Sequence, residues 1–143
     1  MAASYESDFA EWTRDQAFWL RSGDLTRLDT QHLAEEVEGM VWGCRHELAM
    51  CCAGLQAHLA RWQRQSDHRC GLWRRLIDLQ RTRIMRMLNH IPSLRRTVAD
   101  ADFVQDVWID ALMRVVGEDH CYDLPDTSPW SLEQALAPDF WPD

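Results

Sequence analysis

Apolar residues recur every three or four positions along most of the chain, and the longest such run predicts one long helix from Asp29 to about Gln65. The mean spacing of about 3.6 residues matches a nearly straight helix. Asp29 is a suitable N-cap, because its carboxylate accepts hydrogen bonds from the free amides of the first turn. The apolar positions are Leu33, Val37, Met40, Cys44, Leu48, Cys51, Leu55, Leu59 and Trp62.

Shorter periodic runs predict three further helices, over about 7–22, 73–91 and 93–116. Gly23, Pro92 and Gly117 are expected to end them. Asp100 and Asp102 are candidate positions for a break or a restart, and the sequence leaves open whether the last helix is continuous through them. The predicted fold is all-α: a single-domain antiparallel bundle over 1–143, with about four helices and one long central helix.

The last 26 residues form a proline-rich tail that allows only one short helix, over 132–136. Ser131 and Gln134 have the spacing of a capping box. Trp130, Phe140 and Trp141 are too apolar for a free tail, so we expect the tail to pack on the bundle. The expected core positions are Leu48, Cys51, Leu55, Trp62, Ile77, Ile84 and Trp108, with Gly43 and Gly54 as notches for close helix packing.

A chain of 143 residues is long enough to bury a core. It contains no apolar run of eighteen residues, and its first residues are acidic, so we expect neither a membrane span nor a secretory signal. A cytoplasmic location follows as the expectation. Five cysteines cannot all pair within one chain, and we expect them to be reduced and buried.

The charge of the chain is unevenly distributed. The net charge is −8, yet the segment 61–96 holds ten arginines against two aspartates, a local charge of +8, and the chain has no lysine. One interpretation is internal pairing, with the arginines bound to Glu35, Glu38 or their neighbours. The other is an interaction surface, for which the candidates are Arg74, Arg75, Arg81 and Arg86.

Two other chemistries remain open from the residue pattern. Glu36, Glu47 and His58 lie eleven residues apart on one flank of the long helix and suggest a metal-dependent enzyme. Eleven residues span about 16 Å, however, so the three cannot share one ion, and we predict no metal or other cofactor. Arginine interleaved with Trp62 and Trp73 is the pattern of an RNA-binding surface, although an acidic chain disfavours it.

Several segments, taken in order and spacing, resemble the bacterial family called domain of unknown function twenty-nine. They are YESDFAEW (5–12), LAEEVE (33–38), HLARWQ (58–63), Trp73-Arg74, PSLR (92–95), and PWSLEQAL (129–136) with Asp139-Phe140. Arg61 stands where the family pattern has Lys, a change that keeps the charge. The resemblance implies a small all-helical bacterial protein and no established activity.

The sequence therefore favours a protein-interaction or self-associating module, with a homodimer as one form of it, over an enzyme. Nucleic-acid binding through 61–96 is the first alternative, and a metal-dependent enzyme using Glu36, Glu47 and His58 is the second. We expect His58 to be packed and hydrogen-bonded inside the bundle, because it lies beside Leu55 and Leu59 on the apolar stripe.

Overall fold

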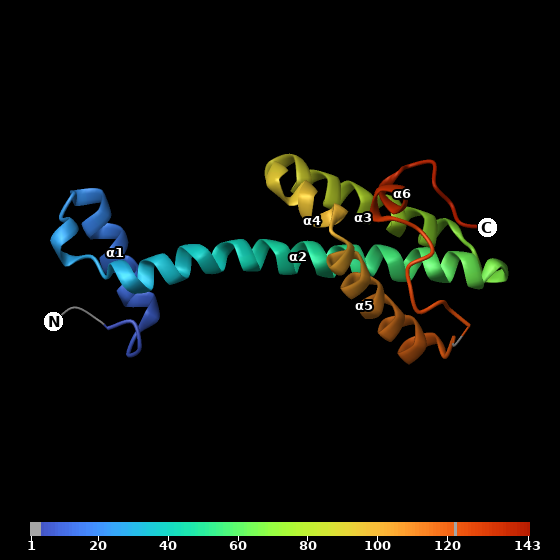
Figure 1. The fold of residues 1–143 in the computed structure, drawn as a ribbon, viewed down its shortest axis with the longest axis horizontal. Helices are drawn as coiled ribbons and strands as arrows, with labels where there is room; N and C mark the ends of the chain where they lie inside the picture. The colour runs from blue at the N-terminus through green and yellow to red at the C-terminus, as the bar shows by residue number, and fades with distance from the viewer. Residues whose placement is uncertain (1–3, 122) are drawn as a thin grey trace. The chain divides into compact units, whose positions relative to one another are not determined.

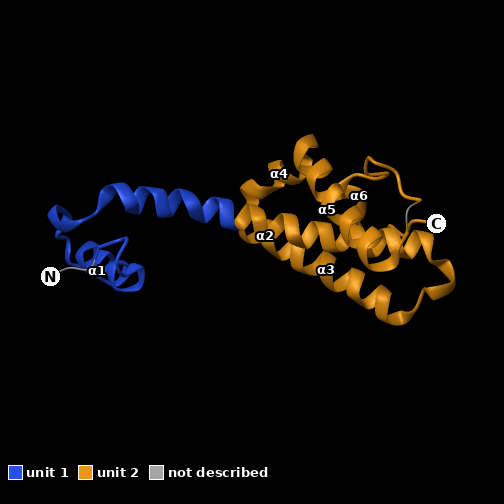
Figure 2. Ribbon diagram, turned by 90° about the horizontal axis from the view of Figure 1, so that it is seen from below, with its two compact units in different colours: residues 1–43 blue, residues 44–143 orange. Residues whose placement is uncertain are grey.

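The computed structural model describes residues 4–121 and 123–143, and every regular element in these ranges is a helix. The predicted all-α class is therefore confirmed. The chain divides into two compact units, unit 1 (residues 1–43) and unit 2 (residues 44–143), which Figure 2 shows in different colours. Within the described ranges, no helix is both long and apolar enough to cross a membrane. The single-domain organisation stays a prediction.

Unit 1 contains α1 (Phe9–Ser22), the short 3-10 helix η1 (Leu25–Arg27) and the first turns of α2 (Thr30–Arg64). The carboxylate of Asp8 accepts a hydrogen bond from the backbone N–H of Glu11 at 3.0 Å, so α1 begins slightly later than predicted. Gly23 ends the helix as expected, with a φ of 76° that a side chain would disfavour.

Unit 2 contains the rest of α2 and then η2 (Ser66–His68), α3 (Gly71–His90), η3 (Pro92–Leu94), α4 (Arg95–Ala99), α5 (Ala101–Asp119) and α6 (Leu132–Leu136). Figure 1 shows α3 running back along α2, and the Glu47–Arg83 ion pair fixes this antiparallel register. The next long helix, α5, runs in the same direction as α2. Arg45 lies over the ring of Phe103 near the start of α5, and Arg61 pairs with Asp119 at its end.

The predicted helix over 93–116 is in fact two helices, α4 and α5. The break lies at Asp100, which is extended and whose carboxylate accepts from the backbone N–H of Phe103 at 2.9 Å. The predicted end at Gly117 was wrong. The last residue of the helix is Asp119. His120, which follows it as the C-cap, adopts the left-handed conformation usual after a helix, with a φ of 53°.

The core of unit 2 contains the predicted positions on three helices. Five of the seven are fully buried, and Cys51 and Trp62 are partly buried against the same cluster. Because other helices cover more than one side of α2, burial extends beyond the predicted stripe to a continuous stretch, residues 52–57. The fully buried predicted positions are Leu48, Leu55, Ile77, Ile84 and Trp108.

The apolar stripe of α2 is buried only in its second half, which corrects the prediction of a uniform core face. Val37 and Met40 are 60% and 67% exposed, whereas Leu48, Leu55 and Leu59 are fully buried. The helices that cover the stripe belong to unit 2. The periodicity of the sequence alone does not show where this cover ends.

The two predicted glycine notches have different surroundings. A Cβ atom at Gly54 would lie 2.9 Å from the side-chain nitrogen of Gln80 and 3.4 Å from Arg114, so this glycine permits close packing of α3 and α5 on α2. A Cβ atom at Gly43 would meet nothing within 4 Å among the described residues. The predicted notch at Gly43 is therefore wrong.

The C-terminal tail packs on unit 2, as predicted from its aromatic residues. Trp130 is buried, and its indole N–H donates to the side-chain oxygen of Gln56. The indole N–H of Trp108 donates to the carbonyl of Pro125 at 2.9 Å, and Phe140 and Trp141 lie partly buried against the core. The predicted capping box of Ser131 is present and begins α6.

The five cysteines form no disulfide, as expected. They are not all buried, however: Cys52 is buried, Cys70 is exposed, and the other three are partly buried. Cys52 is fully buried, and burial raises the pKa of its thiol to about 12, so it remains a neutral apolar group at physiological pH. Cys70 is exposed, because it lies at the N-terminal boundary of α3, outside the core.

Replacing Leu55 by Ala is expected to lower the free energy of unfolding by about 2–5 kcal/mol, because it leaves a cavity in the centre of unit 2. Denaturant unfolding followed by circular dichroism measures the loss. The control is Met113→Ala on α5, which is 62% exposed and should change stability by less than about 0.5 kcal/mol. Equal effects of the two substitutions would contradict the assignment of the core.

Candidate functional site

The four arginines predicted as an interaction surface lie on α3 in different environments. Arg81 is buried, with 4% exposure. Arg74 is exposed and lies over the ring of Trp141, at 4.8 Å from its centroid. Arg75 and Arg86 are exposed and form no ion pair among the described residues. Among the described residues, Arg75 and Arg86 are therefore without an ion-pair partner, whereas Arg81 is engaged internally.

Arg81 holds the C-terminal tail against unit 2. Its guanidinium donates to the backbone carbonyls of Ala135 at 2.9 Å, Pro138 at 3.4 Å and Phe140, and it lies over the ring of Trp141. Burial lowers the pKa of Arg81 from its usual value. A rigid fork of several N–H donors suits a set of carbonyls that would otherwise be left without donors. The sequence offered no sign of this role, because the acceptors are backbone atoms.

Most other arginines of the segment 61–96 also have partners within unit 2. Arg61 pairs with Glu118 and Asp119, Arg64 with Asp123, and Arg83 with Glu47 at 3.1 Å. Arg69 donates to the carbonyl of Trp62 at 2.7 Å and lies over its ring. The expected internal pairing is thus observed, but the acids come from α5, the tail and the middle of α2, and not from Glu35 and Glu38.

The free arginines of α3 share one exposed face with two leucines. Leu72 is 66% exposed and Leu79 is 47% exposed, and their spacing from Arg75 and Arg86 places all four within one side of the helix. We call these four residues the α3 outer face: Leu72, Arg75, Leu79 and Arg86. It presents apolar side chains beside unpaired positive charge.

Glu36, Glu47 and His58 have separate partners. Glu36 accepts a hydrogen bond from the hydroxyl of Tyr5, and Glu47 pairs with Arg83. His58 is partly buried, and its Nδ1 lies 2.9 Å from the carbonyl of Gly54, one turn earlier in α2. Within residues 4–121 and 123–143, no group of three His, Cys, Asp or Glu side chains is arranged to hold a metal ion.

A polar cluster that the sequence did not predict joins α1 to the start of α2 in unit 1. The carboxylate of Asp29 lies at its centre: one oxygen accepts from the indole of Trp12 at 3.2 Å and from Nδ1 of His32 at 2.7 Å. The backbone N–H of Asp29 donates to the buried side chain of Gln16 at 2.8 Å. The ring of Tyr5 stacks on His32, with 4.1 Å between ring centroids.

These contacts shift the ionisation of the cluster. The hydrogen bond from His32 lowers the pKa of the Asp29 carboxyl, and the same bond raises the pKa of the His32 imidazole. The hydrogen bond to Glu36 raises the pKa of the Tyr5 hydroxyl. The spacing of Asp29 and His32, three residues apart at a helix start, is the sequence signal that could have revealed the pair.

Replacing Arg81 by Ala is expected to lower the free energy of unfolding by about 1–3 kcal/mol, because the tail carbonyls lose their donor. Arg75→Ala should change it by less than about 0.5 kcal/mol, because Arg75 is exposed and unpaired. Denaturant unfolding measures both, and limited proteolysis should show faster cleavage of the tail only in Arg81→Ala. Similar losses in the two variants would show that Arg81 has no anchoring role.

The Asp29–His32 contact is expected to make unit 1 sensitive to pH. The contribution of His32 is complete below its usual pKa of 6.5 and is lost as the pH rises through its raised pKa. The contribution of Asp29 is present above its usual pKa of 3.8 and is lost as the pH falls through its lowered pKa. Unit 1 should therefore be most stable between pH 3.8, the usual pKa of Asp, and pH 6.5, the usual pKa of His.

Titration of His32 by NMR tests this directly. The midpoint should lie above 6.5 in the natural sequence and fall in Asp29→Asn, which removes the carboxylate but keeps a side chain of the same size. Amide exchange in α1, corrected for intrinsic rates, should be faster at pH 8 than at pH 6. An unchanged midpoint in Asp29→Asn would refute the contact.

The chain matches the family described as Domain of unknown function DUF29 over residues 4–141. No curated protein and no solved structure matches it. The matched range begins just before Tyr5, includes the α3 outer face and ends at Trp141, which packs beside Arg74 and Arg81. The chain therefore belongs to the DUF29 family.

Proposed function

We propose that the protein is an interaction module that binds a protein partner, either a different protein or a second copy of itself, through the α3 outer face. The observation that carries the proposal is the presence of two exposed leucines beside two arginines that have no acidic partner among the described residues. Exposed leucines at helical spacing suit an apolar helix or groove on a partner. The arginines favour a partner whose rim is acidic.

The composition of this face supports a protein partner over RNA. Leucine side chains offer no ring on which a base can stack. Trp62, one of the two tryptophans expected to stack on bases, instead packs on Trp141 at 4.8 Å between ring centroids and lies under Arg69. Most arginines of 61–96 are engaged within unit 2, which leaves few to contact phosphates.

Photo-crosslinking in cells that produce the protein naturally tests the proposal. A benzoylphenylalanine in place of Leu79 should crosslink to a protein, because this side chain would lie inside the interface. The matched control is the same replacement at Ile109 on α5, which is 43% exposed and lies outside the face. The crosslinked species is identified by mass spectrometry.

Arg75→Glu, added to the variant that carries benzoylphenylalanine at position 79, should reduce the crosslinking yield by about tenfold, because it reverses a charge at the edge of the interface. Arg96→Glu on α4 makes the same charge change at another exposed position and should leave the yield unchanged. A crosslinked species that nuclease digests would contradict the proposal in favour of RNA. Equal crosslinking from positions 79 and 109 would also contradict it.

A further inference from the structure

Unit 1 exposes more large apolar side chains than it buries. Among its described residues, Trp12 is the only large apolar side chain that is buried, with 3% exposure. The first cysteine of the chain is Cys44, so no disulfide within unit 1 can supplement this small core. Eight large apolar side chains of unit 1 are more than half exposed: Phe9, Phe18, Leu20, Leu25, Val37, Met40, Val41 and Trp42.

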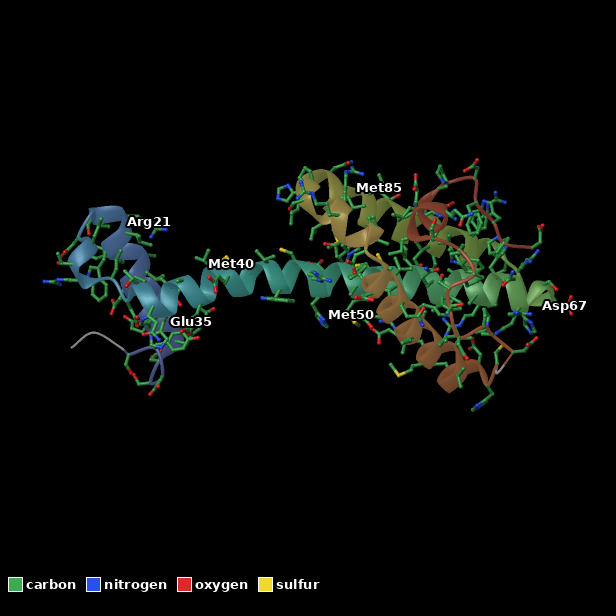
Figure 3. The ribbon with its side chains drawn as sticks, in the orientation of Figure 1. Arg21, Glu35, Met40, Met50, Asp67 and Met85 are labelled. Carbon is green, nitrogen blue, oxygen red and sulfur yellow. The ribbon has the colours of Figure 1, made fainter. Side chains whose placement is uncertain are left out.

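Half of these side chains lie together in the first part of α2. Val37, Met40, Val41 and Trp42 are 60–69% exposed and occur within six consecutive residues. Exposed Glu35 and Glu38 lie beside them in the sequence, and Figure 3 labels Glu35 and Met40 on this part of the helix. Helical spacing places Glu35, Glu38, Val41 and Trp42 on one side of α2, and we call these four residues the α2 acidic segment. Its combination of uncovered apolar side chains and acids is typical of an interaction surface.

The α2 acidic segment and the α3 outer face are complementary. Glu35 and Glu38 carry the negative charges of the first surface, and Arg75 and Arg86, which form no ion pair among the described residues, carry the positive charges of the second. Contact between the two surfaces would cover Leu72 and Leu79 with apolar side chains. It would also bring Glu35 and Glu38 close to Arg75 and Arg86.

Charge also decides between the ways in which two copies could meet. Contact of the α2 acidic segment with the same segment of a second copy would bring carboxylates together, and contact of the α3 outer face with the same face of a second copy would bring guanidinium groups together. Both arrangements are repulsive. Contact between the α2 acidic segment of one copy and the α3 outer face of another is attractive, and reciprocal exchange closes a dimer with two equal contacts.

We infer that the partner of the α3 outer face is the α2 acidic segment of a second copy of this chain. The inference rests on the proposed function, because it names the occupant of the same face. Sedimentation velocity of the purified full chain tests it. The mean mass should exceed that of the monomer at high protein concentration and fall as salt is raised, because ions screen the charges.

Two charge-reversal variants test the two surfaces separately. One combines Glu35→Arg with Glu38→Arg, and the other combines Arg75→Glu with Arg86→Glu. Each alone should weaken self-association by at least about tenfold, because like charges then face each other. All four positions are exposed, so circular dichroism and thermal unfolding should be unchanged.

An equimolar mixture of the two variants is the decisive sample. The reversed α2 segment of the first variant complements the reversed α3 face of the second, and the remaining pair of faces is unaltered. The mixture should therefore recover association to within about threefold of the natural protein. Loss in both variants without recovery in the mixture overturns the inference, as does self-association that neither variant weakens.

A chain that stays monomeric at every concentration and salt also overturns the inference. In that case the crosslink from position 79 separates the two proposals. A crosslink to a different protein leaves the proposed function standing without self-association, whereas the absence of any crosslink removes both. A crosslinked product that contains two copies of this chain supports both together.

Discussion

The structure of unit 2 depends on the enclosure of the second half of α2. Between Cys52 and Ala57 every residue of this helix is buried, which requires neighbours on more than one side. Small side chains make this possible, since Ala53, Gly54 and Ala57 let α3 and α5 approach closely.

Arginine performs two different tasks in the protein. Buried Arg81 satisfies carbonyls of the tail and fixes α6 and the residues after it. Exposed Arg75 and Arg86, on the same helix, form no ion pair among the described residues. Internal pairing therefore accounts for only some of the arginines in the positive segment 61–96. Arg75 and Arg86 remain at the surface, beside the exposed leucines of α3.

The two units differ in how well they cover their own apolar surface. Unit 2 buries aromatic and aliphatic side chains from α2, α3, α5 and the tail in one cluster. Unit 1 relies on the polar contacts of Asp29 with Trp12, His32 and Gln16 and leaves Val37 to Trp42 largely exposed. A hydrogen bond contributes less to stability than burial of a large apolar side chain, so these polar contacts do not replace the apolar burial that unit 2 has.

The sequence by itself determined the class of the fold and the positions of several helix ends and caps. Helical periodicity predicted α2 to within a residue at each end, and capping chemistry located Gly23, Asp29 and Ser131. These features depend on neighbours in the chain, and a single sequence records them directly. The aromatic residues of the tail likewise predicted its packing, because so much apolar surface is costly in water.

Only the tertiary structure decided which residues of one sequence pattern are buried or bonded and which face solvent. Val37 and Leu55 occupy the same stripe, yet one is exposed and the other buried. Arg75 and Arg81 lie on one helix, yet one faces solvent and the other binds the tail. In each case the difference comes from elements distant in sequence: the helices that cover α2 and the backbone carbonyls that reach Arg81. Backbone acceptors leave no residue signature, and helical periodicity gives the face of a residue but not what lies against it.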